Sequence, residues 1–175
     1  QKGIVTQEEL SASKQQTPYS CEYEKLSKDR VKLLISASKR VDNELSKKIN
    51  EFIDGRKHLA DFCRFMALKE ANGLKEWSEW ECLEYDTAVE FGWRFIQYEF
   101  FTQWQQIKEY ANSRGVKIIG DIPIYVAHDS VDVWSAPEEF LLDERYNPCV
   151  VAGCPPDAYA EDGQLWGNPI YNWDK

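Results

Sequence analysis

The chain has 175 residues, of which 43% are hydrophobic and 14% aromatic, and this supply of apolar side chains favours a packed core over disorder. Thirty acidic against 21 basic residues give a formal net charge of −9, which argues against nucleic acid and anionic membrane surfaces as partners, because both attract clustered Lys and Arg. No apolar run approaches the roughly 18 residues of a membrane span, and five scattered cysteines with two distant histidines predict reduced thiols in a cytoplasmic protein without a metal site.

The first half of the sequence is predicted to be helical. Apolar residues recur at helix-like spacing over 23–41 and again over 44–72. Gly55 interrupts the second run, so a kink or a break between two helices is expected there. Gly73 follows the run at the position where a C-terminal cap is expected.

A third long helix is predicted over 86–113. Asp86 or Thr87 can serve as its N-cap, and Gly115 is placed to end it. Aromatic residues occur on most faces of this helix, which favours a buried helix, although a sugar-stacking platform is the alternative. They are Phe91, Trp93, Phe95, Tyr98, Phe100, Phe101, Trp104 and Tyr110.

The character of the sequence changes after this helix. Residues 116–120 form a short β-branched apolar run, with Asp121 directly after it and Pro123 two residues later. Helix, glycine, short apolar run and polar residue is the pattern of an αβ unit that feeds a parallel strand. In a (β/α)8 barrel the residue just past a strand's C-terminal end faces the active site. The pattern therefore predicts a buried strand that delivers Asp121 to a site; capping of the next turn is the alternative.

The stretch 153–169 is predicted to be a long loop. Three glycines and three prolines in 17 residues exclude regular helix or strand for most of it. Tyr, Trp, Asp, Gln and Asn stand at its bends, and long loops of this kind are usually functional or disordered. The aromatic content favours function.

Runs in the last third of the sequence together resemble the amylomaltase (4-alpha-glucanotransferase) family. Residues 120–127 and 129–134 are similar to the strand-end motif of that family. Residues 151–157 and 163–169 are similar to the flexible loop that those enzymes hang over the glucan cleft. The similarity becomes looser towards the N-terminus.

The resemblance implies an α/β fold, a partial (β/α)8 (TIM) barrel of the alpha-amylase-like type with a large helical insertion, mostly helical in this chain. Residues 1–110 are expected to be mainly the insertion and a barrel helix. Residues 111–175 are expected to supply a barrel strand end and the active-site loop. The missing initiator Met indicates either that the natural start was removed or that the chain was cut from a longer protein.

The family transfers segments of α-1,4-glucan between maltooligosaccharide, starch or glycogen chains with retention of configuration. Retention uses two carboxyls roughly 5–5.5 Å apart, one as nucleophile and one as acid/base. The resemblance places both, and a third Asp, beyond Lys175, so no catalytic residue is assigned here. The implied chemistry needs no metal and no organic cofactor.

The resemblance implies substrate-binding roles for side chains of the strand end and the loop. A pyranose stacks its C–H face on an aromatic ring, and its hydroxyls need a few fixed polar partners. The residues concerned are Asp121, Tyr159 and Trp166, with Asp157, Gln164 and Asn168 as further polar candidates. Tyr159 and Trp166 have the alternative role of pinning the loop, and Trp134 and Trp173 are interpreted as packing residues.

Two other functions stay open at the level of sequence. A non-catalytic glucan-binding helical module would use the same aromatic loop. A related hydrolase would share the fold, and a chain without the catalytic strands does not distinguish hydrolysis from transfer.

Overall fold

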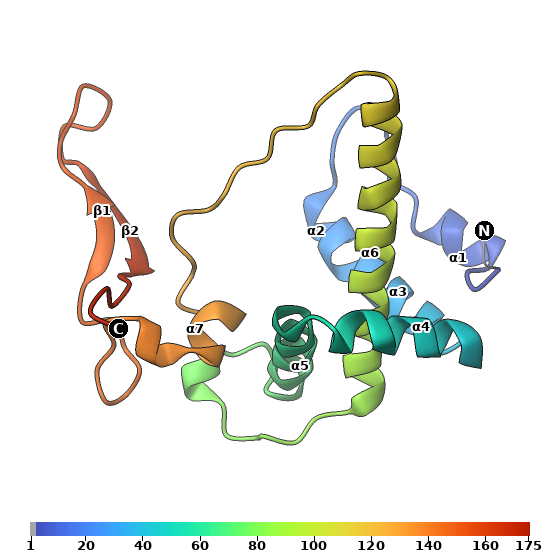
Figure 1. Cartoon of the computed structure of the whole chain (residues 1–175), viewed down its shortest axis with the longest axis horizontal. Coiled ribbons are helices and arrows are strands. Elements are labelled where there is room, and N and C mark those ends of the chain that lie inside the picture. Colours follow the sequence, from blue (N-terminus) through green and yellow to red (C-terminus); the bar gives the residue numbers. More distant parts are fainter. Residues whose placement is uncertain (1–2) are drawn as a thin grey trace. The chain divides into compact units, whose positions relative to one another are not determined.

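The computed structural model describes residues 3–175, and most of its regular structure is helical (Figure 1). In chain order the elements are α1 (Gln7–Ala12), α2 (Tyr23–Lys25), the π-helical turn η1 (Leu26–Arg30), α3 (Val31–Ser38), α4 (Asn43–Asp54), α5 (Lys57–Ala71), the 3₁₀ turn η2 (Trp77–Glu79), α6 (Thr87–Ser113), α7 (Val131–Ser135), the 3₁₀ turn η3 (Pro137–Glu139), β1 (Val151–Cys154) and β2 (Gln164–Pro169). The chain divides into two compact units. The helical unit runs to Ala67 and resumes at Glu84–Ile118, and the hairpin unit comprises Leu68–Leu83 and Ile119–Lys175.

Side-chain caps fix where two helices of the helical unit begin. The Asp42 carboxylate accepts a hydrogen bond from the Leu45 N–H at 2.8 Å, and the Asp86 carboxylate accepts one from the Ala88 N–H at 2.8 Å. The three predicted helices are confirmed: the first becomes α2, η1 and α3, and the third becomes α6. The second is divided at Gly55 into α4 and α5, as its glycine predicted.

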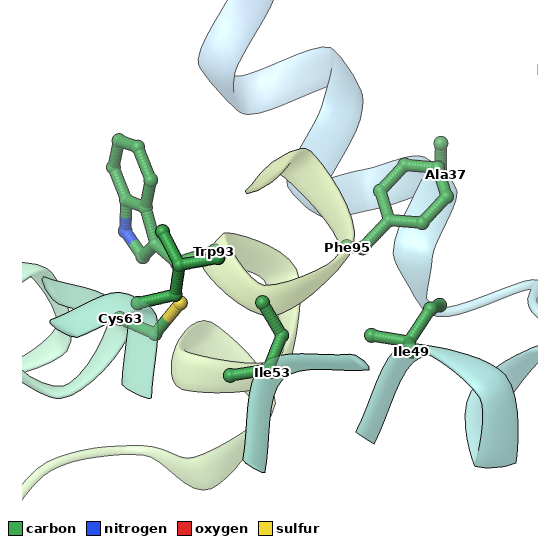
Figure 2. Close-up of a cluster of buried hydrophobic side chains, with 7 residues drawn as sticks. Ala37, Ile49, Ile53, Cys63, Trp93 and Phe95 are labelled. Carbon is green, nitrogen blue, oxygen red and sulfur yellow. The ribbon is translucent and has the colours of Figure 1, made fainter. Parts of the chain in front are cut away.

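The core of the helical unit lies among α3, α4, α5 and α6 (Figure 2). Gly92 allows α6 to approach α3 closely, because a Cβ at that position would lie 2.9 Å from the Ile35 Cγ1. Burying one isoleucine side chain contributes about 1.5–3 kcal/mol, and the cluster buries two, Ile49 and Ile53. Burial also raises the pKa of the Cys63 thiol to about 12. The buried residues are Ala37, Ile49, Ile53, Leu59, Cys63, Trp93 and Phe95.

The prediction that aromatic residues bury α6 is confirmed only for its first half. Trp93 and Phe95 are buried, whereas Phe100, Trp104 and Tyr110 are exposed. Phe91, Tyr98 and Phe101 are half-buried against the core. The helix is therefore a core element at one end and a solvent-facing one at the other.

The predicted parallel strand over 116–120 is not formed, and the expectation of a strand here is wrong for the chain as it stands. No strand is assigned over 116–126, and Ile119 and Ile122 are 94% and 82% exposed. A strand exists only when a neighbouring strand takes up its backbone N–H and C=O groups. Residues 3–175 offer this segment no such neighbour.

A hairpin occupies most of the stretch predicted as loop. β1 and β2 pair antiparallel, with Val151 opposite Pro169, Gly153 opposite Leu165 and a bulge between the two pairs. A Cβ on Gly153 would lie 2.4 Å from the Gln164 carbonyl oxygen, so this position needs glycine. The prediction that most of this stretch lacks helix and strand is confirmed for 155–163, but the pairing of β1 with β2 was not foreseen. Gly153 in β1 lies beside the bulge and Pro169 stands at the end of β2, where proline is tolerated.

The described part of the chain contains no helix that is both long and apolar enough to cross a bilayer.

Candidate functional site

The segment after the predicted strand end begins with an exposed carboxylate. Asp121 is exposed, and its Oδ1 accepts a hydrogen bond from the N–H of the next residue, Ile122, at 2.8 Å. That bond is local and leaves the second oxygen facing solvent. The arrangement is compatible both with capping of the turn and with contact to a ligand.

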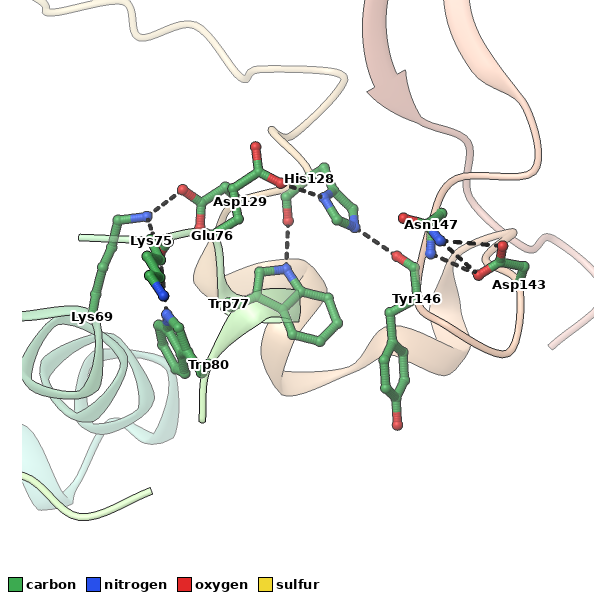
Figure 3. Close-up of polar contacts among 10 residues, drawn as sticks. All are labelled: Lys69, Lys75, Glu76, Trp77, Trp80, His128, Asp129, Asp143, Tyr146 and Asn147. Atoms are coloured by element: carbon green, nitrogen blue, oxygen red, sulfur yellow. Dashed lines mark hydrogen bonds and ion pairs between the residues drawn. The ribbon is translucent and has the colours of Figure 1, made fainter. Parts of the chain in front are cut away.

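Three side chains from elsewhere in the hairpin unit hold the next residues of the segment, and two of them are drawn in Figure 3. The Trp77 indole N–H donates to the His128 carbonyl at 2.8 Å, and Lys69 forms an ion pair with Asp129. The Asn168 side-chain amide donates to the Val126 carbonyl at 2.8 Å. This part of the backbone is not paired with a strand, and side-chain contacts hold it in place instead.

His128 has a structural role, because its ring connects two parts of the hairpin unit. One ring nitrogen, Nε2, lies 2.7 Å from the Tyr146 carbonyl oxygen, and the other, Nδ1, lies 3.9 Å from a Glu76 carboxylate oxygen (Figure 3). Its ring packs on Trp77 with centroids 5.6 Å apart. The ring therefore ties η2 to the turn that contains Tyr146.

That turn is held in a conformation that bulky residues rarely adopt. Tyr146 has φ +63°, in the left-handed region. The Asp143 carboxylate accepts hydrogen bonds from the backbone N–H groups of Asn147 and Arg145 at 2.9 and 2.8 Å. These donors, with the Asn147 N–H first, hold the pKa of Asp143 below its ordinary value.

Trp166 on β2 is the best-organised candidate for contact with a ligand. Its indole N–H donates to the Gln164 side-chain oxygen at 3.0 Å, and its ring lies 6.0 Å from the Tyr125 ring, centroid to centroid. The indole is nevertheless 49% exposed. A ring whose orientation is fixed and whose face is open to solvent is suited to stacking against a sugar.

Asp157 and Tyr159 stand together at the tip of the hairpin. The Asp157 carboxylate accepts hydrogen bonds from the N–H groups of Tyr159 and Ala160 at 2.8 and 2.9 Å. The carboxylate thus shapes the turn that presents Tyr159, whose side chain is 98% exposed. A fully exposed aromatic ring does not pin the loop to the residues described here.

The structure therefore divides the predicted contacts into groups. Gln164 and Trp166 are hydrogen-bonded to each other, Asp157 positions Tyr159, and the amide of Asn168 is used inside the protein. Asp121 keeps only its local bond. Contact of these six residues with a substrate stays a prediction.

Two tryptophans and a tyrosine need separate mention. Trp134 lies 6.2 Å from the Trp80 ring, which agrees with its interpretation as a packing residue. The same interpretation is wrong for Trp173, which is 84% exposed and meets the Tyr171 ring on one side only. Tyr125 was missed as a site residue, because its partner Trp166 is 41 positions away and no local spacing pattern joins them.

No group of three or more His, Cys, Asp or Glu side chains within residues 3–175 is arranged to hold a metal ion.

Comparison with known proteins gives consistent matches. The family model for 4-alpha-glucanotransferase, Glyco_hydro_77, matches residues 2–175. A 4-alpha-glucanotransferase of Clostridium butyricum is 44% identical over 160 residues, which cover 83% of this chain and 33% of the relative. A chloroplastic/amyloplastic 4-alpha-glucanotransferase of Arabidopsis thaliana is 37% identical over 173 residues, 88% of this chain and 30% of the relative.

The solved structures include a close match of fold. An amylomaltase from Streptococcus agalactiae in complex with acarbose superposes with a TM-score of 0.88 at 37% sequence identity, over 98% of this chain and 38% of the other. The chain thus spans about a third of the length of the proteins that it matches.

Proposed function

The chain belongs to the 4-alpha-glucanotransferase family, and we propose that it is part of an enzyme that moves α-1,4-glucan segments between maltooligosaccharide, starch or glycogen chains. Because the chain spans about a third of its relatives' length, the proposal assigns the activity to a longer protein, called the full-length enzyme below. In this proposal the chain supplies substrate-binding residues and neither the nucleophile nor the acid/base.

The fixed, half-exposed indole of Trp166 is the observation that supports this role best. Its orientation is set by Gln164 and by Tyr125 before any ligand arrives. A ring that needs no reordering loses less conformational entropy on binding, so it contributes more of its stacking energy. Gln164 keeps its side-chain N–H groups for a sugar hydroxyl, because only its oxygen is used by the indole.

The proposed reaction is a retaining double displacement. A carboxylate attacks the anomeric carbon while a carboxylic acid protonates the departing glycosidic oxygen, and a covalent glycosyl-enzyme forms. The same second group then removes the proton from the 4-hydroxyl of the acceptor glucan, which attacks and releases the carboxylate. Both carboxyls are proposed to lie outside residues 1–175, and no metal or cofactor enters the proposal.

Transfer instead of hydrolysis requires that water be kept from the glycosyl-enzyme. The β1–β2 hairpin is suited to that task, because its tip projects Tyr159 into solvent while Asn168 anchors its base to Val126. We therefore propose that the hairpin covers the cleft and that Tyr159 and Trp166 line the acceptor path. Asp121 is proposed to organise the cleft around the sugar at the scissile bond.

Disproportionation of maltotriose tests the proposal. The full-length enzyme should release glucose from maltotriose and form longer maltooligosaccharides, whereas the purified 175-residue chain should do neither. Glucose release by the chain alone would overturn the placement of the catalytic carboxyls outside it. Net hydrolysis without longer products would favour a related hydrolase.

The cellular location is a further proposal. All five cysteines are free thiols, and a protein with several unpaired thiols suits the reducing cytoplasm. Fractionation of the source cells with a glucanotransferase assay of each fraction tests it, and activity in a secreted fraction would contradict it.

A further inference from the structure

A second feature built of aromatic rings and amides lies in the helical unit, entirely separate in sequence from the hairpin. A surface groove of about 530 Å³ runs between α4 and α6. This volume is within the range of small-molecule sites. We call it the α4–α6 groove and define it by its lining residues Phe52, Arg56, Tyr98, Phe101, Thr102, Gln105 and Gln106.

The rings of the groove are packed into a fixed platform. Phe52 meets Tyr98 edge to face at 5.5 Å between centroids, and it meets Phe101 at 5.9 Å. All three are half-buried against the core of the unit, so one side of each is held and the other faces the groove. Such rings present an apolar surface without the cost of ordering it on binding.

Polar groups surround this platform. The Arg56 guanidinium lies over the Phe52 ring, 3.9 Å from the ring centroid, and one of its nitrogens donates to the Phe52 carbonyl at 2.8 Å. Gln105 donates to Glu109 at 2.8 Å and retains a free carbonyl oxygen. The Gln106 side chain makes no hydrogen bond within residues 3–175, so both its donor and its acceptor groups are available.

The side chains that line the α4–α6 groove indicate which chemical class of ligand fits it. The groove is lined by rings, amides, one hydroxyl and one cation, and no carboxylate is among its lining residues. A neutral polyol fits better than an ionic ligand, because amides supply both donors and acceptors to hydroxyl groups and the rings accept the C–H face of a pyranose. An anionic ligand would find one positive charge and no clustered partner for it.

We propose that the α4–α6 groove is a second carbohydrate-binding site, which holds the outer part of a long α-glucan while another part of the chain is processed. The inference rests on the proposed function for the identity of the glucan, and on the groove's own chemistry for the site. Binding of polymer at this groove raises its local concentration at the enzyme. Maltotriose gains nothing, because a molecule of three sugars has none left over for the groove once it is bound where the bond is broken.

Substitutions at exposed amides test the groove with little risk to folding. In the full-length enzyme, the double variant Gln105→Ala/Gln106→Ala should raise KM for amylose about fivefold, as expected for the loss of one or two hydrogen bonds to a sugar. KM and kcat for maltotriose should stay within about twofold of the unsubstituted enzyme. The matched control is Gln103→Ala, which removes an exposed glutamine of the same helix that does not line the groove.

A binding measurement separates recognition from catalysis. Electrophoresis in native gels containing glycogen should retard the full-length enzyme, and Phe101→Ala and the double glutamine variant should migrate with less retardation than Gln103→Ala. The melting temperature of each variant is measured alongside. A variant with a lower melting temperature and unchanged retardation would mean that its side chain packs the helical unit and does not bind glycogen, which overturns the inference.

The remaining outcomes are equally decisive. Equal losses on amylose and maltotriose, or no loss on either, overturn the inference and leave the proposed function intact. If the unsubstituted full-length enzyme does not disproportionate maltotriose, the proposed function fails. The glycogen gel then decides the groove by itself.

Discussion

Ile53 and Ile119 have the same side chain and opposite environments in this structure. Ile53, in α4, is fully buried in the core of the helical unit, whereas Ile119, in the predicted strand, is 94% exposed. The difference lies in how helices and strands satisfy their backbones. A helix bonds its own N–H groups to carbonyls four residues away, whereas a strand needs another strand, which can be distant in sequence. The helices therefore form through hydrogen bonds that are local in the sequence. The segment 116–126 forms no strand, because its hydrogen-bond partners would have to come from another strand.

This contrast has a physical consequence for the isolated chain. Unpaired extended backbone with exposed isoleucines is a template for pairing with other chains. We expect the 175-residue chain to aggregate through this segment at high concentration, while α4, α5 and α6 stay helical and packed. Hydrogen exchange should then show protection in α6 and fast exchange over 117–125.

The largest expected effect comes from truncating the two isoleucines. In the 175-residue chain, Ile53→Ala should lower the free energy of unfolding by about 2–5 kcal/mol, because it leaves a cavity in the core. Ile119→Ala, the matched control, should change it by less than about 0.5 kcal/mol, since the side chain is already in water. Urea unfolding followed by circular dichroism measures both.

The same two variants in the full-length enzyme sharpen the comparison. If 116–120 becomes a barrel strand there, Ile119→Ala should cost about as much as a core truncation. An Ile119→Ala cost near zero in both proteins would mean that the segment is a surface loop. The strand prediction would then be wrong beyond this chain as well.

The same distinction explains what the sequence could predict. Periodic apolar residues, Asp86 as a cap and Gly55 as a break are local signals, and the corresponding helices are found where they were expected. The β1–β2 hairpin was missed because Gly153 in β1 and Pro169 in β2 were counted as breakers, although a bulge and a strand end accommodate them. The meeting of Tyr125 with Trp166 depends on chain reversal, which residue spacing does not encode.

Substitution of the ion pair between Lys69 and Asp129 tests what holds the segment after Asp121 in place when no strand pairs with it. Its side chains are only 15% and 28% exposed, so removal of either partner leaves a poorly solvated charge. A double-mutant cycle with Lys69→Met and Asp129→Asn should give a coupling free energy of about 1–3 kcal/mol. The exposed pair of Lys28 and Glu24 provides a matched cycle, for which less than about 1 kcal/mol is expected. Equal couplings would show that the segment after Asp121 is not held by this pair.

Trp166 separates function from stability within the same unit. In the full-length enzyme, Trp166→Ala should lower kcat/KM for maltotriose about tenfold, which corresponds to roughly 1.4 kcal/mol of lost stacking. Its melting temperature should change little, because the indole is half-exposed. Trp173→Ala, at another exposed tryptophan, is the control and should leave kcat/KM unchanged. A lower melting temperature with unchanged kinetics would instead assign Trp166 to packing.

Substitution of Asp143 should have the smallest effect on stability. It tests how the turn at Tyr146 is held outside any sheet. Hydrogen bonds from the Asn147 and Arg145 N–H groups hold the pKa of its carboxyl below the ordinary 3.8. A depressed folded-state pKa adds stability above the unfolded value, and this stability is lost as the pH falls through the folded value.

Urea unfolding of the chain between pH 7 and pH 3 should therefore show a small stability advantage over Asp143→Asn at neutral pH, and the advantage should vanish as the carboxyl protonates. Glu144→Gln removes a neighbouring charge but leaves these hydrogen bonds in place, so it should keep the pH dependence of the unsubstituted chain. An Asp143→Asn variant with the same pH dependence as the unsubstituted chain would show that this carboxylate contributes nothing to the turn. The left-handed conformation of Tyr146 would then rest on the His128 contact, the backbone hydrogen bonds of the turn and the Trp77 ring.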